Sequence, residues 1–142
     1  MKRFSILLFA LVAIVPLVGC GSSDNSTVTG VITTTDGQVV SGGRITFTSV
    51  SPPISASSRI APDGSYELSS VEPGDGAPVG HYQVAIVSKI STAGGDGRNG
   101  RSVATSKSLV HDKYADIRTS ELTAEVTPGS NKIDFTVEPP KK

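Results

Sequence analysis

The chain has 142 residues, with 13 Lys and Arg against 13 Asp and Glu, a single Cys and no Trp. This length suits one domain behind a leader segment, and the balanced charge offers no broad basic surface, which excludes nucleic acid as a partner. A single Cys cannot form an internal disulfide, so the fold must be stable without one. The frequent Gly, Pro, Ser and Thr favour strands and turns over helices.

The first nineteen residues are arranged like a secretory signal. Lys2 and Arg3 give a positive start, and residues 4–18 are almost entirely apolar. This run is shorter than the ~20 residues that a membrane-spanning helix needs. We therefore predict that residues 1–19 are a signal peptide, helical over residues 3–18, which is removed and does not pack into the fold.

Four residues close this apolar run: Leu17, Val18, Gly19 and Cys20. They resemble the lipobox of bacterial lipoproteins. The resemblance implies cleavage before Cys20 and acylation of its thiol and new amine, palmitate being a typical acyl group. Several acyl chains hold a protein stably on a membrane, whereas one does so only marginally. The expected location is the exported side of the bacterial cell envelope, on the outer membrane if the cell has one. The alternative is an incidental Cys in an ordinary signal peptide.

Removal of the leader leaves 11 basic residues against 13 acidic ones, a net charge near −2. Residues 20–27 are small and polar after the Cys, and they are expected to form a flexible tether. The folded domain is expected to span residues 28–138, and residues 139–142 form a polar, disordered tail.

From Val28 onward, apolar side chains recur at every second position, which is the period of a half-buried strand. The alternation predicts strands over residues 28–33, 44–50, 65–69, 80–88, 122–126 and 132–137, with shorter extended pieces at 38–40 and 59–61. Turn signals separate them at Asp36-Gly37, Pro52-Pro53, Pro62-Asp63-Gly64 and Pro128-Gly129. No segment has a helical period, so we predict an all-β fold, an antiparallel sandwich of about seven strands.

Two tyrosines alternate with core positions in these strands. Tyr66 and Tyr82 are therefore predicted to pack inside the sandwich and not to form a binding surface. Tyr82 follows closely on Gly80, at a place where a tyrosine corner would anchor the edge of a sandwich.

Several short motifs occur in a fixed order: Val28-x-Gly30-x-Ile32, Asp36-Gly37, Gly43-x-Ile45-x-Phe47, Asp63-Gly64-Ser65-Tyr66 and Gly80-x-Tyr82-x-Val84-x-Ile86. The order is similar to that of carboxypeptidase regulatory-like domains. The later motifs resemble the ending of bacterial lipoproteins of that group: Lys113-Tyr114, Ser120-x-Leu122-Thr123 and Phe135-x-Val137. The resemblance covers roughly residues 27–138 and implies a seven-stranded Greek-key sandwich of transthyretin-like (prealbumin-like) type. The chain departs from the pattern at Val39-Val40 and at Val110-His111-Asp112, where prolines are expected.

Candidate catalytic and metal-binding residues are few. The sequence Gly95-x-Gly97-x-x-Gly100 matches the dinucleotide fingerprint, but no helical segment follows it, and it lacks the carboxylate spacing of an EF-hand. His81 and His111 have no Cys or carboxylate at zinc-ligand spacing, and no nucleophile motif is present. In carboxypeptidases the resembling domain is the non-catalytic one. We therefore expect no catalytic residue, no metal, no cofactor and no enzymatic activity.

Residues 89–108 lack periodicity and are expected to form a long loop. Lys89, Arg98, Arg101 and Lys107 stand there against a single acid, Asp96, which gives the segment a charge of +3. Loops of this length are generally functional or disordered. The segment is thus either a solvated loop or a contact site for an anionic polymer, a lipid head group or a partner protein.

These observations predict a membrane-anchored bacterial lipoprotein with a non-catalytic β-sandwich module for envelope structure or protein interaction. The alternative is a module that binds a glycan or cell-wall ligand through loops at one end of the sandwich. The absence of Trp argues against strong stacking on sugars. The expected partners are the membrane, through acyl chains on Cys20, and an envelope protein or a surface glycan.

Overall fold

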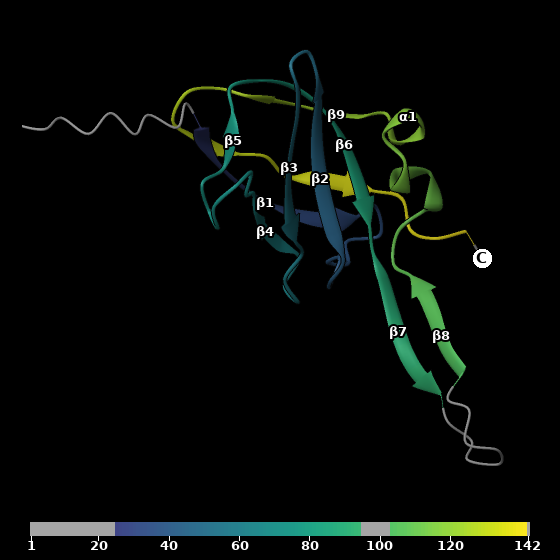
Figure 1. Ribbon diagram of the computed structural model, residues 1–142. Coiled ribbons are helices and arrows are strands. Elements are labelled where there is room, and N and C mark those ends of the chain that lie inside the picture. Colours follow the sequence, from purple (N-terminus) through teal and green to yellow (C-terminus); the bar gives the residue numbers. More distant parts are fainter. Residues whose placement is uncertain (1–24, 95–102, 142) are drawn as a thin grey trace, which may run out of the picture.

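A computed structural model of the protein describes residues 25–94 and 103–141, and these residues form a fold made mostly of β-strands (Figure 1). In chain order the strands are β1 (Asn25–Thr34), β2 (Arg44–Val50), β3 (Pro53–Arg59), β4 (Ser65–Glu67), β5 (Ala77–Pro78), β6 (Gly80–Val87), β7 (Lys89–Gly94), β8 (Val103–Ser108), β9 (Leu122–Val126), β10 (Ser130–Lys132) and β11 (Phe135–Val137). A 3-10 helix, η1 (Asp112–Ala115), and a one-turn helix, α1 (Ile117–Ser120), stand between β8 and β9.

The strands form two larger sheets and one separate pair. In the first sheet β1 lies between β10 and β11 on one side and β4 and β5 on the other, and it is the strand through which all of them are joined. The second sheet has the order β3-β2-β6-β9, with every pair antiparallel. β7 and β8 pair with each other as a hairpin.

The core lies between the two larger sheets, and Phe47 of β2 is at its centre. Its ring lies 6.3 Å from that of Tyr66 on β4, 5.9 Å from that of Tyr82 on β6 and 6.0 Å from that of Phe135 on β11, centroid to centroid. Tilted and edge-to-face ring pairs at such distances are favourable beyond the area they bury. The cluster joins strands from both sheets, so the two sheets share one hydrophobic core.

Both predicted core tyrosines are buried, as the alternation indicated. The Tyr66 hydroxyl donates to the carbonyl oxygen of Ile133 at 2.6 Å, and the Tyr82 hydroxyl donates to that of Pro78 at 2.7 Å. Burial raises the pKa of both phenols. The second bond ties β6 to the segment just before it, as in a tyrosine corner, but β6 lies between β2 and β9 and is not an edge strand.

Strand β1 alternates between buried and outward residues along its whole length, with Val28 and Ile32 completely buried. Gly30 lies on the same face between them. A Cβ built at Gly30 would lie 1.8 Å from the carbonyl oxygen of Ile133 and 2.9 Å from the Tyr66 ring. Only glycine therefore permits the close approach of β1 to the last part of the chain.

The prediction of seven strands in purely antiparallel sheets is wrong in two respects. Residues 25–94 and 103–141 contain eleven strands, several of them only two or three residues long, and β1 pairs in parallel with both β10 and β11. The predicted strand over residues 132–137 is divided in two. The Asp134 carboxylate accepts a hydrogen bond at 2.8 Å from the backbone N–H of Val31. A side chain thus takes the place of a strand partner between β10 and β11.

Pro52-Pro53 was predicted to end the strand over residues 44–50, and β2 does end at Val50. Most of the next strand, β3, was not predicted; it begins at Pro53 at the edge of its sheet, where a missing N–H donor is tolerated. The tether predicted over residues 20–27 overlaps β1, because Asn25 and Ser26 already pair with Pro78 and Ala77. The predicted signal-peptide helix lies outside the described residues.

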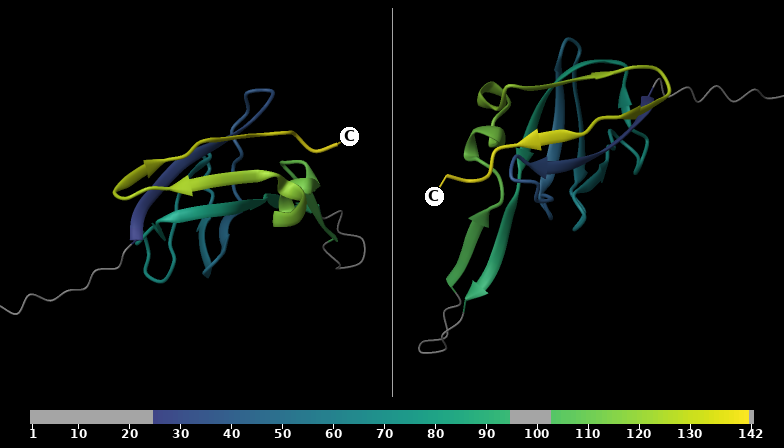
Figure 2. Two further views of the ribbon diagram at one scale, coloured as in Figure 1. Left: turned by 90° about the horizontal axis from the view of Figure 1, so that it is seen from above. Right: turned by 180° about the vertical axis from the view of Figure 1, so that it is seen from behind.

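The loop predicted over residues 89–108 contains the β7–β8 hairpin. Among the described strands β7 and β8 pair only with each other, and the hairpin projects from the body of the molecule (Figures 1 and 2). The helices η1 and α1 were missed because four residues are too few to show a helical period. Within residues 25–94 and 103–141, no helix is long and apolar enough to cross a bilayer.

Candidate functional site

The pairing of the strands divides the body of the molecule into two ends. The near end is where β1 begins at Asn25, and the segments 50–53, 70–79 and 127–130 lie there. The far end is where β1 finishes, with the turn 35–43 and the C-terminal tail. The hairpin leaves the body on the side opposite the start of β1 (Figure 2).

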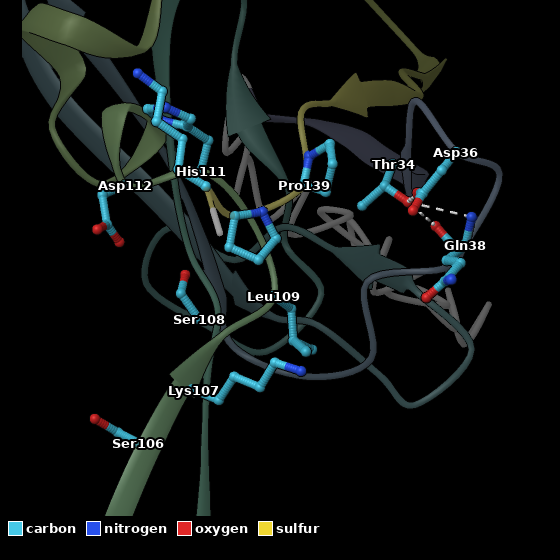
Figure 3. Close-up of a pocket in the computed structure, with 12 residues that line it drawn as sticks. Thr34, Asp36, Gln38, Ser106, Lys107, Ser108, Leu109, His111, Asp112 and Pro139 are labelled. Atoms are coloured by element: carbon cyan, nitrogen blue, oxygen red, sulfur yellow. Dashed lines mark hydrogen bonds between the residues drawn. The ribbon is translucent and has the colours of Figure 1, made fainter.

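A groove of about 890 Å³ lies at the far end, beside the base of the hairpin (Figure 3). Three segments line it: the turn after β1, the end of β8 with the residues that follow, and the C-terminal tail. The lining residues are Thr34, Asp36, Gln38, Ser106, Lys107, Ser108, Leu109, His111, Asp112, Pro139, Pro140 and Lys141.

Backbone hydrogen bonds hold these three segments together. The N–H of Thr35 donates to the carbonyl oxygen of Val137 at 2.9 Å, which fixes the tail against the turn after β1. The N–H of His111 donates to the carbonyl oxygen of Glu138, also at 2.9 Å, which fixes the tail against the chain after β8. The groove thus depends on the parallel pairing of β1 with β11.

The wall formed by the turn after β1 is held by the Thr34 side chain. Its hydroxyl contacts the Asp36 carboxylate, lies 3.0 Å from the carbonyl oxygen of Gln38, and accepts from the N–H of Gln38 at 3.2 Å (Figure 3). The Asp36-Gly37 pair makes this turn, as the sequence predicted, with Gly37 at a φ of +83°. The turn presents a carboxylate and an amide side chain at the groove.

The opposite wall begins at His111. Its Nδ1 accepts a hydrogen bond at 3.1 Å from the backbone N–H of Lys113 and so caps η1. Asp112 follows on the groove side, and Lys107 and Lys141 also line the groove. The groove therefore combines carboxylates, amines, hydroxyls and an imidazole, a set that suits a polar and charged partner surface.

Beside the groove, η1 is fixed to the tail by an ion pair. Lys113 Nζ lies 2.5 Å from Glu138 Oε1, and the Tyr114 hydroxyl accepts from the backbone N–H of Glu138 at 3.1 Å. The hydrogen bond to Glu138 raises the pKa of Lys113, and the bond from Lys113 lowers the pKa of Glu138. These contacts hold Glu138, the residue directly before the predicted tail 139–142.

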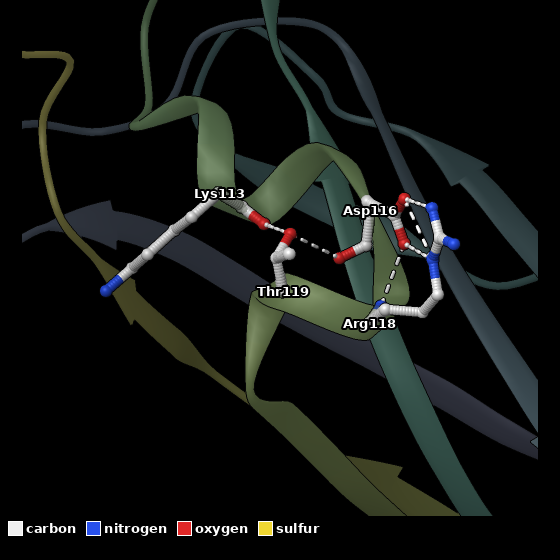
Figure 4. Close-up of polar contacts among 4 residues, drawn as sticks. All are labelled: Lys113, Asp116, Arg118 and Thr119. Atoms are coloured by element: carbon white, nitrogen blue, oxygen red, sulfur yellow. Dashed lines mark hydrogen bonds and ion pairs between the residues drawn. The ribbon is translucent and has the colours of Figure 1, made fainter.

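A second ion pair orders the short helix α1 (Figure 4). Arg118 Nη2 lies 2.5 Å from Asp116 Oδ2, and the Asp116 carboxylate also accepts from the backbone N–H of Arg118 at 2.9 Å. Hydrogen bonds from the Arg118 side chain hold the pKa of Asp116 at about 2. The Thr119 hydroxyl donates at 2.7 Å to the carbonyl oxygen of Lys113 and so ties α1 to η1.

The structure describes only part of the predicted site. Leu17, Val18, Gly19 and Cys20 lie outside the described residues, and so do Arg98 and Arg101. Lys89 and Lys107 are described and exposed. They stand on opposite strands at the base of the hairpin, where Lys89 pairs with Ser108 and Ile90 with Lys107. The two lysines thus lie next to the groove and not on a separate loop.

The two histidines are far apart. His81 is exposed at the near end, on β6 and opposite Glu125, whereas His111 lies in the far-end groove. In the part of the chain that the structure describes, no three His, Cys, Asp or Glu side chains are grouped as metal ligands would be.

The groove itself was not predicted from the sequence. Of its lining, only Lys107 and His111 had been considered as candidate site residues; Asp36 had been named for a turn, and Asp112 for a departure from the family pattern. Its walls come from residues 34–38, 106–112 and 139–141, and no local pattern in the sequence indicates that they meet.

The chain has few detectable similarities to known proteins. No protein-family model matches the chain, and no curated protein matches its sequence. Among solved structures, a 9R-lipoxygenase from Cyanothece PCC8801 is similar over 82% of this chain and 17% of its own, with 12% identity and a TM-score of 0.43. The chain thus spans about a sixth of that protein's length. The resemblance to carboxypeptidase regulatory-like domains stays a prediction.

The prediction that the chain is not an enzyme is contradicted in one respect: the solved chain that it resembles is an enzyme by its title. At 12% identity and this TM-score, the likeness carries no activity over to the present chain. We therefore withdraw the exclusion of enzymatic activity and assign no reaction.

Proposed function

We propose that the protein is a lipid-anchored lipoprotein of the bacterial cell envelope that presents the far end of its β-sandwich to another envelope protein. The observation that carries this proposal is the position of the lipobox. Cys20 stands five residues before Asn25, where β1 begins at the near end. Five residues span at most about 18 Å even when fully extended. An acylated Cys20 would hold the near end close to the membrane and leave the groove on the opposite side.

The chemistry of the groove supports a protein partner over a glycan. Sugars are commonly bound by stacking on the rings of Trp, Tyr or Phe, and none of these lines the groove among the described residues. Its carboxylates, amines, amide and hydroxyls suit a polar protein surface with both signs of charge. The exposed Lys89 beside it extends the same surface to the hairpin.

We also infer that the sandwich is of the transthyretin-like type found in carboxypeptidase regulatory-like domains. The ordered series of glycine, Asp-Gly and alternating motifs supports this inference. So does the observation that those motifs supply core residues of both sheets, among them Ile32, Phe47, Tyr66 and Tyr82.

The anchor is tested by the Cys20→Ala variant of the full chain in a bacterial host. The wild-type protein should incorporate a labelled fatty acid and sediment with membranes, and Cys20→Ala should lose both properties. Ser22→Ala, two residues further on, should keep both. The anchor is disproved if Cys20→Ala still sediments with membranes and the wild-type protein carries no fatty-acid label.

The partner is tested by photo-crosslinking from the groove in intact cells. A photoreactive residue in place of Lys107 or Asp112 should give a discrete adduct with another envelope protein. The same residue in place of Thr123, on the outer face of the second sheet, should not. Equal adducts from all three positions would mean that the groove is not the contact site.

A further inference from the structure

The near end carries the most exposed apolar side chains of the described residues. Val71, Val50 and Val79 have 86%, 75% and 52% of their surface exposed. The remaining exposed large apolar residues, Val39 and Val87, lie at the far end and are exposed to 48% and 41%. Exposed prolines stand in the same near-end segments: Pro52, Pro53, Pro73 and Pro128. We call the three valines and four prolines the near-end rim.

The rim surrounds the point where the described chain begins. Val79 borders a shallow hollow that Asn25 and Pro128 also line. Val50 borders a second hollow together with Gly80, the neighbour of Val79. The loop that carries Val71 is joined to β1 by a hydrogen bond of 3.2 Å from Asn25 Nδ2 to Asp75 Oδ2. Three separate segments thus bring apolar side chains to the end where the tether enters.

The loop with Val71 has a fixed shape, because Asp75 holds it from within. The Asp75 carboxylate accepts hydrogen bonds from the backbone N–H groups of Ser70 at 2.6 Å and of Val71 and Glu72 at 3.0 Å. These bonds, the one from Ser70 foremost, lower the pKa of Asp75. The Val71 side chain therefore stays exposed because the backbone that carries it is held in place.

The charge of the near end is also distinctive. Segments 25–26, 50–53, 70–79 and 127–130 contain no Lys or Arg, and their acids are Glu72 and Asp75. Asp75 accepts from backbone N–H groups, which leaves Glu72 as the exposed charge of these segments, and the adjoining strands add exposed Glu125 opposite His81. Such a surface has no means of attracting an anionic polymer or anionic head groups. It fits an apolar or neutral surface.

We propose that the near-end rim rests on the lipid bilayer, with Val50, Val71 and Val79 at the boundary between head groups and acyl chains. This inference rests on the proposed function, because acylated Cys20 is what brings the rim to the membrane. Five residues hold Asn25, the start of β1 at the near end, within about 18 Å of the anchored Cys. At the high effective concentration that such a short link gives, a weak apolar contact is enough to orient the domain.

The lone Cys of the chain provides the test. Because Cys20 is blocked by acylation, a Cys introduced elsewhere is the only free thiol. Val71→Cys and Val79→Cys in the full-length acylated protein are labelled with a nitroxide and reconstituted in phosphatidylcholine vesicles, with Lys141→Cys at the far end as the matched control. The nitroxides at 71 and 79 should collide several-fold less often with a water-soluble nickel complex, and more often with oxygen, than the one at 141. Salt of about 1 M should not change this, because ionic contacts are the ones that salt screens.

Three results would overturn the inference. Labels at 71 and 79 as accessible to nickel as the label at 141, in protein that is acylated and sediments with vesicles, would remove the bilayer contact and leave the anchor intact. Shielding that high salt abolishes would show an ionic contact instead. A wild-type protein that carries no fatty acid and does not sediment with vesicles would disprove the anchor, and the bilayer contact would then be disproved as well. A triple variant gives a further expected result. When Val71→Cys is combined with Val50→Asp and Val79→Asp, the nitroxide at 71 should become accessible to the nickel complex, while sedimentation with vesicles should be unchanged.

Discussion

The sandwich body and the β7–β8 hairpin are built from similar residues, but different forces hold them in place. In the body, β2, β6 and β9 each bury one face against the other sheet, and Phe47 contacts rings from both layers. The hairpin strands pair with each other and with no other described strand. An isolated two-stranded pair is at best marginally stable in water. Stability should therefore reside in the body, and the hairpin should be replaceable without loss of fold.

The largest expected effect is at the centre of the body. Phe47→Ala removes the ring that joins β2 to Tyr66, Tyr82 and Phe135, and it leaves a cavity between the sheets. We expect the free energy of unfolding in urea to fall by about 3–5 kcal/mol. Val50→Ala, on the same strand but 75% exposed, should change it by less than about 0.5 kcal/mol. Equal losses in the two variants would mean that Phe47 is not at the centre of the core.

A smaller effect is expected where a loop of the body is held by a carboxylate. Asp75→Ala removes the carboxylate that accepts from three backbone N–H groups. Because the loop is exposed, water can partly replace this acceptor, so we expect the free energy of unfolding at pH 7 to fall by about 1 kcal/mol. Glu72→Ala, an exposed acid of the same loop, is the matched control and should stay within about 0.5 kcal/mol of the wild type.

The effect of Asp75 should also depend on pH in a defined direction. The pKa of Asp75 is lower in the folded protein than its ordinary value of 3.8. Its contribution is therefore complete above the pKa of the unfolded chain and is lost as the pH falls through the folded pKa. The difference in unfolding free energy between wild type and Asp75→Ala should be greatest near neutral pH and should vanish in acid. A difference that is constant with pH would show that Asp75 does not act through its charge.

The smallest effect is expected in the hairpin. Replacement of residues 91–105 by a short Gly-Ser turn removes strands that pair only with each other among the described residues. We expect the free energy of unfolding of the body to change by less than about 0.5 kcal/mol, as measured by urea unfolding followed by circular dichroism. A loss of 2 kcal/mol or more, on the order of a core substitution, would show that the hairpin contributes to the core.

The same comparison explains which parts of the fold were predictable from the sequence. β2 and β9 were predicted with their observed bounds, and β6 with one extra residue, because a buried face imposes a period of two on the sequence. The burial of Tyr66 and Tyr82 followed from the same pattern. The sequence of residues 89–108 shows no period of two, so the hairpin strands, which pair only with each other among the described strands, were predicted as a loop.

The candidate site was less predictable, for a different reason. The groove exists because β11 returns parallel to β1 and brings Pro139 and Lys141 to the same groove as Asp36. Strand alternation carries no information about strand direction, so the contact between the turn after β1 and the tail could not be read from the sequence. The four residues that resemble a lipobox, in contrast, are contiguous, so that resemblance can be seen in the sequence alone; it stays a prediction.

The pairing of β1 also limits when the first sheet can be completed during folding. β1 is the first of the described strands, and its partners β10 and β11 are the last two, with Thr27 opposite Ser130 and Thr34 opposite Val137. Its hydrogen bonding stays incomplete until residue 137 has been synthesised, and such long-range pairing forms slowly. The parallel return to β1 therefore means that the first sheet is completed only when β10 and β11 are available, however early β1 itself emerges.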